Sequence, residues 1–276
     1  MPSRRMSGWV CLFVAAVSTR AVADDTSPPY PWPAGARAAV SLAYDDALPT
    51  HLDIAIPALD RHGLHGSFYL VLSADTVRTR LAVWRAAARR GHELGNHSLF
   101  HACSARGADR AWVSPEQDLD KMTAARVQAE VVLGNTMLHA IDGSTEVTFT
   151  VPCGDRDAGD GDYVAGLAPH MLGIKLGAGA VVADMRTLDR HAVPVMVPEG
   201  STGAELIALV EEAGARGTMV NFTFHGIGGD HLAVSSEAHE ALLAYLAAHR
   251  DIYWTATFRE QMRWVRDVER AAAAPP

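Results

Sequence analysis

Two adjacent carboxylates, Asp45 and Asp46, end a short apolar run, 38–44, whose composition predicts a buried strand. Like charges at the end of a strand repel each other, and each is costly to bury without a partner. We therefore expect a cation beside the pair, so the rest of the chain should supply other groups that bind one.

Three more polar clusters directly follow predicted strands. They are His97-Ser98-Leu99-Phe100-His101, Pro152-Cys153-Gly154 and His225-Gly226-Ile227-Gly228-Gly229. In parallel α/β folds the loops at the carboxyl ends of the strands open on one face, and that face carries the chemistry. Clusters far apart in sequence are therefore expected to converge with Asp45 and Asp46.

The chemistry suggested by these clusters is metal-assisted hydrolysis. His97 and His101, one helical turn apart, form with one aspartate a two-histidine, one-carboxylate set for Zn²⁺ or a similar divalent ion. Such an ion lowers the pKa of a bound water, and the second aspartate can take that water's proton. Spacing alone does not decide which aspartate ligates and which is the base. The plainer interpretation of the histidine pair is two surface residues on one turn.

Strand and helix signals alternate along the chain. This pattern predicts an α/β fold with a parallel sheet covered by helices, either a barrel or a doubly wound sheet. Ser114-Pro115-Glu116-Gln117 and Thr202-Gly203-Ala204-Glu205 both read as helix starts. The least regular stretch is 173–197, in which 192–197 is a candidate strand. The predicted strands are 38–44, 66–72, 92–97, 146–151, 218–224 and 252–258, and the predicted helices are 50–61, 79–90, 114–139, 202–215 and 237–247.

The first 23 residues have the pattern of a secretory signal peptide. Two arginines, a short apolar centre and a small-x-small end at Ala23 favour cleavage there and export to the periplasm or medium. A membrane anchor is the alternative, but the apolar run is far shorter than the roughly 20 residues that a span needs. We expect a Pro-rich lead-in over 24–36, one domain over 37–270, and no membrane span after cleavage.

The net charge and the cysteine content limit which binding partners and which cellular compartment are expected. The net charge is −8, and the predicted leader contains three arginines and no acids, so a nucleic acid or an anionic membrane is not an expected partner. Cys11 lies in the leader, which leaves Cys103 and Cys153 in an oxidising compartment. Each lies in or just after a polar cluster, and we predict a disulfide between them. The alternative is two buried free cysteines.

The chain resembles the polysaccharide deacetylase (NodB-homology) family, carbohydrate esterase family 4, from about Trp32 to Trp264. The resemblance rests on four motifs in the family's order: "YDDA" (44–47), "NHSLFH" (96–101), "VPCG" (151–154) and "FHGIGG" (224–229). It implies a distorted (β/α) barrel with about seven parallel strands. It also implies hydrolysis of acetyl groups from an acetylated oligo- or polysaccharide.

The resemblance assigns roles residue by residue. Asp45 matches the family's catalytic base, and Asp46, His97 and His101 match the metal ligands, with Zn²⁺ favoured and Co²⁺, Ni²⁺ or Mn²⁺ as alternatives. His225 matches the general acid, and the backbone N–H of Cys153 the donor to the oxyanion. N-acetyl amides are favoured over O-acetyl esters, because amide cleavage depends more on protonation of the leaving group.

Two departures from the family pattern bear on the site. The third motif of the family carries an arginine that holds the base, followed by Pro and Tyr, whereas this chain has Thr150, Pro152 and Cys153. The fourth motif, an Asp with a Trp, has Asp184 as its nearest candidate. His231 follows His225 closely, which a cleft lining and ordinary loop polarity explain equally well.

Two other functions remain alternatives: a catalytically decayed carbohydrate-binding protein, and a hydrolase of a small non-sugar amide on the same fold. The intact set of Asp45, Asp46, His97, His101 and His225 argues against decay. Nothing in the sequence predicts the sugar, the linkage or the oligomeric state.

Overall fold

A computed structural model describes residues 29–107 and 109–274. The predicted signal peptide and the first residues of the Pro-rich lead-in lie outside the described residues. The predicted boundaries of these segments therefore stay predictions.

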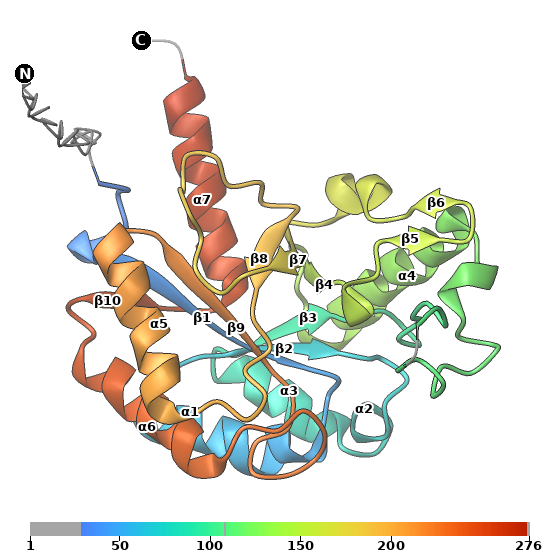
Figure 1. The fold of residues 1–276 in the computed structure, drawn as a ribbon, viewed down its shortest axis with the longest axis horizontal. Coiled ribbons are helices and arrows are strands. Elements are labelled where there is room, and N and C mark those ends of the chain that lie inside the picture. The colour runs from blue at the N-terminus through green and yellow to red at the C-terminus, as the bar shows by residue number, and fades with distance from the viewer. Residues whose placement is uncertain (1–28, 108, 275–276) are drawn as a thin grey trace, which may run out of the picture.

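Parallel strands form a distorted barrel at the centre of the molecule (Figure 1). Around the barrel the order of seven strands is β9-β1-β2-β3-β4-β7-β8. Met196, just after β8, donates its N–H to Asn221 and accepts from the N–H of Thr223, and these bonds bring β8 to β9. The predicted barrel with about seven parallel strands is confirmed. The strand bounds are β1 Ala38–Asp45, β2 Ser67–Leu70, β3 Glu93–Asn96, β4 Thr148–Thr150, β7 Gly173–Ala178, β8 Val193–Val195 and β9 Met219–Phe224.

An eighth strand, β10 (Tyr253–Thr255), shares one edge of β1 with β2. It pairs with the first half of β1, from Ala38 to Val40, whereas β2 pairs with the second half, from Ala43 to Asp45. All eight residues of β1 are buried, as expected for a strand covered on both faces.

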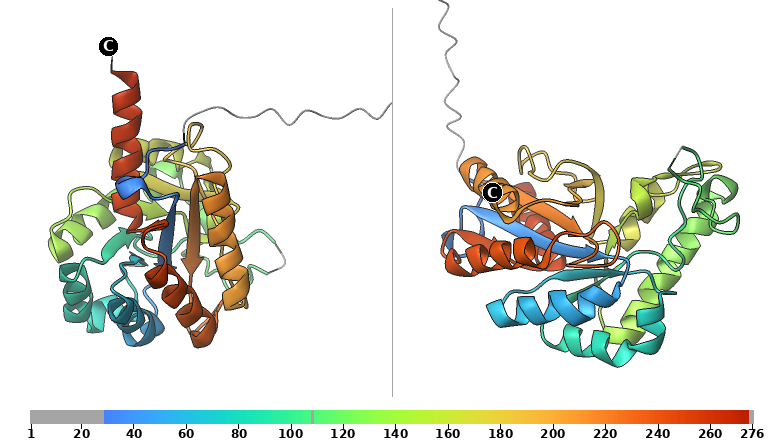
Figure 2. Two further views of the ribbon diagram at one scale, coloured as in Figure 1. Left: turned by 90° about the vertical axis from the view of Figure 1, so that its left-hand side faces the viewer. Right: turned by 60° about the horizontal axis from the view of Figure 1, so that its bottom comes forward.

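Helices cover the outside of the barrel, and α7 projects beyond it at the end of the described chain (Figures 1 and 2). Within the described residues, no helix is both long enough and apolar enough to cross a membrane. A small antiparallel hairpin, β5 (Asp157–Ala158) and β6 (Gly161–Asp162), lies apart from the barrel sheet. The helix bounds are α1 Ile56–His62, α2 Asp75–Thr79, α3 Leu81–Arg89, α4 Ala124–Asp142, α5 Gly203–Arg216, α6 Ser236–Ala248 and α7 Phe258–Ala273.

Capping residues fix the starts of several helices. Thr202 and Glu205 form the predicted capping box of α5, and Thr257 and Glu260 form another at the start of α7. Gly217 ends α5 in the left-handed conformation, with φ of 71°, which glycine adopts without strain. Local sequence therefore determines where the helices that flank β9 and β10 begin and end.

The helix predicted to begin after Ser114 begins at Ala124 instead, with Thr123 as its N-cap. The segment before it is held by contacts distant in sequence: backbone hydrogen bonds join Cys103 to Gln117 and Leu119. Ser114 closes only a single turn by accepting the N–H of Gln117. A helix over 114–123 would break the pairing at Cys103, so tertiary contacts override the local signal.

Candidate active site

A cavity of about 940 Å³ opens at the carboxyl end of the barrel strands, where the sequence places the polar clusters. It is lined by residues from all four clusters and by Trp112, Thr150, Lys175, Thr223 and His231 among others. The cluster residues in its wall are Asp45, Asp46, His97, His101, Cys153, Gly154 and His225. The structure thus brings together the residues predicted for metal binding and catalysis.

Asp46 and the two histidines of the second cluster direct acceptor atoms at one another. Oδ1 of Asp46 lies 3.3 Å from Nε2 of His97 and 3.4 Å from Nε2 of His101, and it is buried without a hydrogen-bond partner. His97 donates its Nδ1–H to the carbonyl oxygen of Thr150, 2.8 Å away, so the neutral ring has its lone pair on Nε2.

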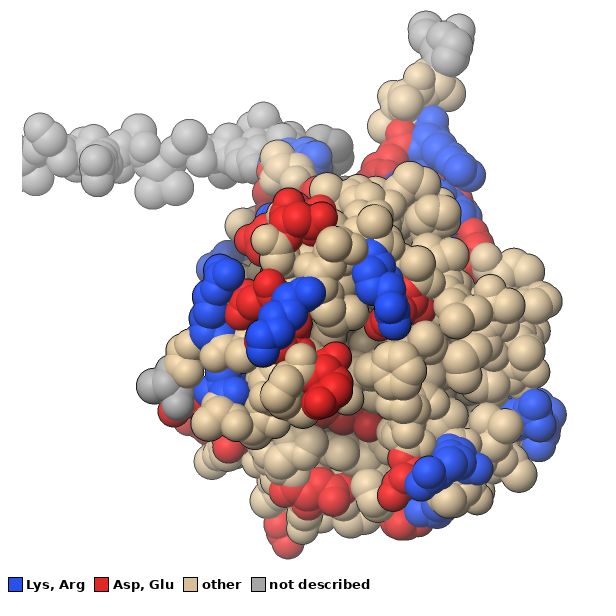
Figure 3. Space-filling view, turned by 90° about the vertical axis from the view of Figure 1, so that its right-hand side faces the viewer, with Lys and Arg blue, Asp and Glu red and all other residues tan. Residues whose placement is uncertain are grey.

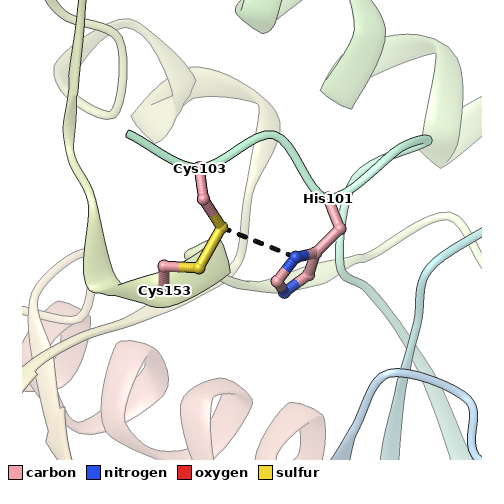
Figure 4. A group of neighbouring side chains, drawn as sticks. All are labelled: His101, Cys103 and Cys153. Carbon is pink, nitrogen blue, oxygen red and sulfur yellow. Dashed lines mark hydrogen bonds between the residues drawn. A yellow bond between two sulfur atoms is a disulfide. The ribbon is translucent and has the colours of Figure 1, made fainter. Parts of the chain in front are cut away.

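His101 has the same tautomer as His97, but a different contact fixes it. Nδ1 of His101 lies 3.5 Å from Sγ of Cys103, which is joined to Cys153 in a disulfide with 6.0 Å between the Cα atoms (Figure 4). A disulfide sulfur carries no hydrogen, so His101 is the donor in this contact and Nε2 keeps its lone pair. Two imidazole lone pairs and one carboxylate oxygen therefore converge on one point.

This arrangement of acceptor atoms favours the binding of a cation. Burial opposes charge on His97, but Asp45 and Asp46 outweigh it and raise the pKa of His97 to about 9, so a proton is attracted where no ion is bound. The donor set, two nitrogens and one carboxylate oxygen with an open side toward the cavity, fits Zn²⁺ or a similar divalent ion. Asp46, His97 and His101 are the residues that would hold it.

The two adjacent aspartates differ in protonation. Burial raises the pKa of Asp45 to about 6, although His97 and Lys175 act in the opposite direction. Asp46 is also buried, but the hydrogen bond from His231 and the positive charge that His97 gains on protonation hold its pKa well below the usual range. Neighbouring groups with pKa values pushed apart are typical of acid–base sites. Asp46 thus stays an anion suited to ligation, and Asp45 is suited to accept a proton near neutral pH.

His225 lies at the end of β9, with Nε2 3.8 Å from Oδ2 of Asp46. Burial lowers the pKa of His225 to about 4, so the ring is neutral in the free site. His51 accepts the N–H of Leu48 at Nδ1 and therefore donates Nε2–H to the carbonyl oxygen of His225, 2.9 Å away. This buried histidine fixes the backbone of His225 against the loop that follows β1.

His231 belongs to the site rather than to loop surface alone. Its Nε2 lies 2.8 Å from Oδ2 of Asp46, the oxygen turned away from His97 and His101. By binding Oδ2, His231 leaves Oδ1 directed at the two histidines, a common way to orient a carboxylate ligand.

A buried lysine supplies the positive charge that Thr150 cannot. Lys175 on β7 is in register with Thr150 on β4, and it lines the cavity together with Asp45. Its Nζ is 3.4 Å from Oγ of Ser41 and lies 4.8 Å and 5.4 Å from the ring centroids of Phe258 and Tyr69. Burial lowers the pKa of Lys175 to about 8. Its charge helps to keep Asp45 ionised, although it comes from the neighbouring strand.

Backbone strain is concentrated around this cavity. Among the described non-glycine residues with positive φ, only Ala34 lies outside the site loops. Each such residue costs of order 1–3 kcal/mol, and strain of this kind accumulates at functional sites. The others are Asp46, Ala47, Ser98, His101, Cys153, Asp230 and Leu232, with φ between 47° and 81°.

The candidate for the family's fourth motif is wrong. Asp184 lines a different cavity, of about 700 Å³, together with Tyr30 and Arg216, and its carboxylate binds Arg186. Val182, two residues before Asp184, donates its N–H to the carbonyl oxygen of Met219 at the start of β9. His225 follows the other end of that strand, so Asp184 lies at the end of the barrel away from the site. Lys175 and Trp112, which the sequence analysis did not single out, are in the site instead. A lone lysine in the apolar strand 173–178 was the only signal for Lys175.

Comparison with known proteins supports the family resemblance. Residues 34–164 match the family model described as polysaccharide deacetylase. This segment contains Asp45, Asp46, both histidines of the candidate metal site and both cysteines of the disulfide. Over this segment, slightly less than half of the chain, the sequence matches the polysaccharide deacetylase family.

Solved structures support the fold over most of the chain. A putative polysaccharide deacetylase from Mycobacterium smegmatis is 16% identical, with a TM-score of 0.57 and coverage of 88% of this chain and 95% of that one. The peptidoglycan deacetylase PdaC from Bacillus subtilis is 14% identical, with a TM-score of 0.51 and coverage of 85% and 94%. The Xyl-CE4 domain of a xylanase from the hindgut metagenome of Trinervitermes trinervoides is also 14% identical, with a TM-score of 0.50 and coverage of 86% and 92%. No curated protein matched.

Proposed function

We propose that this protein is a metal-dependent hydrolase that removes acetyl groups from an acetylated carbohydrate. The observation that carries the proposal is the convergence of one carboxylate oxygen and two imidazole lone pairs beside Asp45, a second buried carboxylate. A divalent ion held there would lower the pKa of a bound water and polarise the acetyl carbonyl.

The residues around the ion would divide the acid–base work. Asp45, whose pKa is raised to about 6, would take the proton of the attacking water. His225, neutral in the free site, would first gain a proton and then donate it to the leaving nitrogen or oxygen. The backbone N–H of Cys153, in the cavity wall, would donate to the oxyanion. Lys175 and His231 would position Asp45 and Asp46 respectively.

An N-acetyl amide is the favoured substrate bond. An amine leaves only after it is protonated, and His225 is placed next to the metal ligands for that task. Similarity in fold to PdaC, named a peptidoglycan deacetylase, agrees with this choice, and the xylanase domain keeps the O-acetyl ester open.

The decisive assay is acetate release from chitooligosaccharides, peptidoglycan and acetylxylan, with added Zn²⁺ and with a chelator. Release that is lost with the chelator and restored by Zn²⁺ is the expected result. His101→Ala should lose both the ion and the activity, whereas His170→Ala, at an exposed histidine, should lose neither. Full occupancy by the ion in His101→Ala would refute the ligand assignment.

We also infer that the protein is exported. The disulfide between Cys103 and Cys153 is typical of oxidising compartments, and the predicted signal peptide would direct the chain there. Intact mass of the protein from periplasm or medium should show cleavage after Ala23 and no thiol that can be alkylated without reduction. A full-length, fully alkylated chain would contradict export.

A further inference from the structure

Asp46 has two carboxylate oxygens, and a different pair of histidines faces each of them. Oδ1 lies 3.3 Å from Nε2 of His97 and 3.4 Å from Nε2 of His101. Oδ2 lies 2.8 Å from Nε2 of His231 and 3.8 Å from Nε2 of His225. The candidate metal site uses only the first oxygen, so the second pair of histidines requires an explanation of its own.

The second set has the composition and spacing of a divalent-cation site. One donor atom from each of Asp46, His225 and His231 lies within 4.8 Å of the other two. Bonds of about 2.0–2.2 Å to a tetrahedral Zn²⁺ place neighbouring ligand atoms roughly 3.3–3.6 Å apart, so only small adjustments are needed. Hydrolases with two metal ions hold them about 3.5–4 Å apart, a separation that the two oxygens of one carboxylate can span.

The ring of His225 is available to a ligand. Its Nδ1 is buried without a hydrogen-bond partner among the described residues, and 3.8 Å is too long for a hydrogen bond between Nε2 and Asp46. The backbone is nevertheless fixed, because His51 donates its Nε2–H to the carbonyl oxygen of His225. The ring is therefore positioned through its backbone, and Nε2 can bind an ion.

The loop that carries His231 is held in place by contacts of its backbone. Gly226 donates its N–H to the carbonyl oxygen of His231, 2.9 Å away. Asp230 accepts the N–H of Thr50 at 3.1 Å, which joins the loop to the segment after β1. These contacts keep the ring of His231 beside that of His225, with 5.6 Å between the ring centroids.

The second set should bind an ion more weakly than the first. An ion at Oδ2 must replace the hydrogen bond that Nε2–H of His231 donates to Asp46, and His231 must then carry its proton on Nδ1. The side chain of His231 is 55% exposed, against 2% for His97 and 22% for His101, so water competes more strongly for it. A first ion beside Oδ1 would also repel a second.

We propose that Asp46, His225 and His231 form a second, weaker site for a divalent cation, joined to the first through the carboxylate of Asp46. Nitrogen and carboxylate donors suit Zn²⁺ and similar transition-metal ions better than Mg²⁺ or Ca²⁺. The effect of this site on activity rests on the proposed function: an ion bound to Nε2 of His225 removes the general acid, so excess Zn²⁺ should inhibit.

Zinc titration of the metal-free protein tests the site, with calorimetry for affinity and elemental analysis after dialysis for stoichiometry. The wild type should bind two ions per chain, the second about tenfold or more weakly, because a hydrogen bond to a charged group is lost. His231→Gln places an amide N–H near the position of Nε2 but has no imidazole lone pair, so it should bind one ion. His225→Gln should also bind one, and His170→Ala, at an exposed histidine, should bind two.

The shared carboxylate distinguishes this site from adventitious binding to other residues of a chain with 13 histidines. On the face that carries β5 and β6, acidic side chains lie among basic ones rather than in a patch that would attract cations (Figure 3). Two Co²⁺ ions bridged by Asp46 should couple magnetically, so the paramagnetic resonance signal per ion should fall at the second equivalent in the wild type but not in His231→Gln. One ion in the wild type, or two in both glutamine variants, would overturn the proposal.

The activity test begins with protein that holds one Zn²⁺ per chain. At saturating excess Zn²⁺, acetate release by the wild type should fall at least about a hundredfold, the lower limit of what a general acid contributes. His231→Gln should show no such fall from its own starting rate. Faster release with two ions would overturn the inhibitory role. No release at any Zn²⁺ concentration would instead refute the proposed function, and the stoichiometry would still decide the second site.

Discussion

Buried polar groups are hydrogen-bonded at one end of the barrel interior and lack partners at the other, and strand β3 runs between the two ends. At the amino end of β3, Glu93 accepts hydrogen bonds from Ser67, Thr148 and the backbone N–H of Arg259. At the carboxyl end, beside His97, Oδ1 of Asp45 and Oδ1 of Asp46 are buried with no partner among the described residues.

The difference separates structure from function within one sheet. A buried carboxylate whose oxygens are all bonded stabilises the barrel, whereas one left unpartnered costs stability and is retained for a ligand. The same contrast holds for hydroxyls. Thr148, near Glu93, bonds Tyr69 and Glu93, whereas Oγ1 of Thr223 in the cavity wall has no partner among the described residues.

The largest expected effect separates Asp45 from Asp46. Asp45→Asn should lower kcat by roughly two to four orders of magnitude and keep the ion, because it removes only the proton acceptor. Asp46→Asn should weaken ion binding, because it removes the carboxylate next to His97 and His101. Acetate release and zinc content measure the two effects. Reversed phenotypes would show that the roles carried over from the family are wrong for this chain.

Replacement of Glu93 should lower the stability of the fold, whereas replacement of Asp45 should lower the activity. Glu93→Ala removes the carboxylate 3.7 Å from Nε of Arg259 and leaves the buried hydroxyl of Ser67 and the backbone N–H of Arg259 without their acceptor. We expect a loss of about 3–5 kcal/mol in the free energy of unfolding. Asp45→Asn should leave that free energy unchanged or raise it, because it removes a carboxylate whose burial is unfavourable. Urea denaturation of both variants tests the contrast, and equal destabilisation would abolish it.

The pH dependence of stability should reveal the attraction of the site for a cation. The pKa of His97 is raised from 6.5 to about 9 in the folded, ion-free protein. Its stabilising proton is fully bound below pH 6.5 and is lost as the pH rises toward 9. Lys175, whose pKa is lowered to about 8, acts in the opposite direction above that pH. His97 alone should therefore contribute a loss of about 1.5 kcal/mol between pH 6.5 and 8. Because the pKa values of His51, His101, His225 and His239 are lowered to about 4 and act in the opposite direction over this range, the contribution is read as the difference between the wild type and His97→Gln.

Saturating Zn²⁺ should remove most of this pH dependence, because the ion takes the place of the proton on His97. Urea denaturation at a series of pH values, with chelator or with Zn²⁺, provides the comparison. The same pH dependence in the metal-free wild type and in His97→Gln would mean that His97 is not the group that the aspartates hold protonated.

Sequence identified the parts of the molecule that depend on local signals. The apolar run of β1, the capping box of α5 and the order of the polar clusters are all short-range patterns, and the strand ends they mark lie around one cavity. The helix start at Ser114 failed because the backbone pairing of Cys103 with 117–119 is invisible in the local pattern.

The supporting residues of the site depend on pairings between distant strands. Lys175 reaches the interior because β7 pairs with β4 in register with Thr150, and sequence spacing does not give that register. His231 reaches Asp46 through a loop whose backbone folds back, with Gly226 donating to the carbonyl of His231. Ligand types could thus be read from the sequence, whereas the groups that orient the ligands could not.

The smallest expected effect uses two threonines from the two ends of the barrel, Thr148 and Thr223, both almost fully buried. Replacement by valine keeps the shape and removes only the hydroxyl. Thr148→Val takes a partner from Tyr69 and Glu93 and leaves their polar atoms buried, which should cost about 1–3 kcal/mol. Thr223→Val removes a hydroxyl that no described group bonds, so the free energy of unfolding should change by less than about 0.5 kcal/mol or increase. Chemical denaturation of the metal-free variants resolves this difference. A larger loss for Thr223→Val than for Thr148→Val would show that the carboxyl end of the barrel is held together by its polar groups, and the contrast between the two ends would fail.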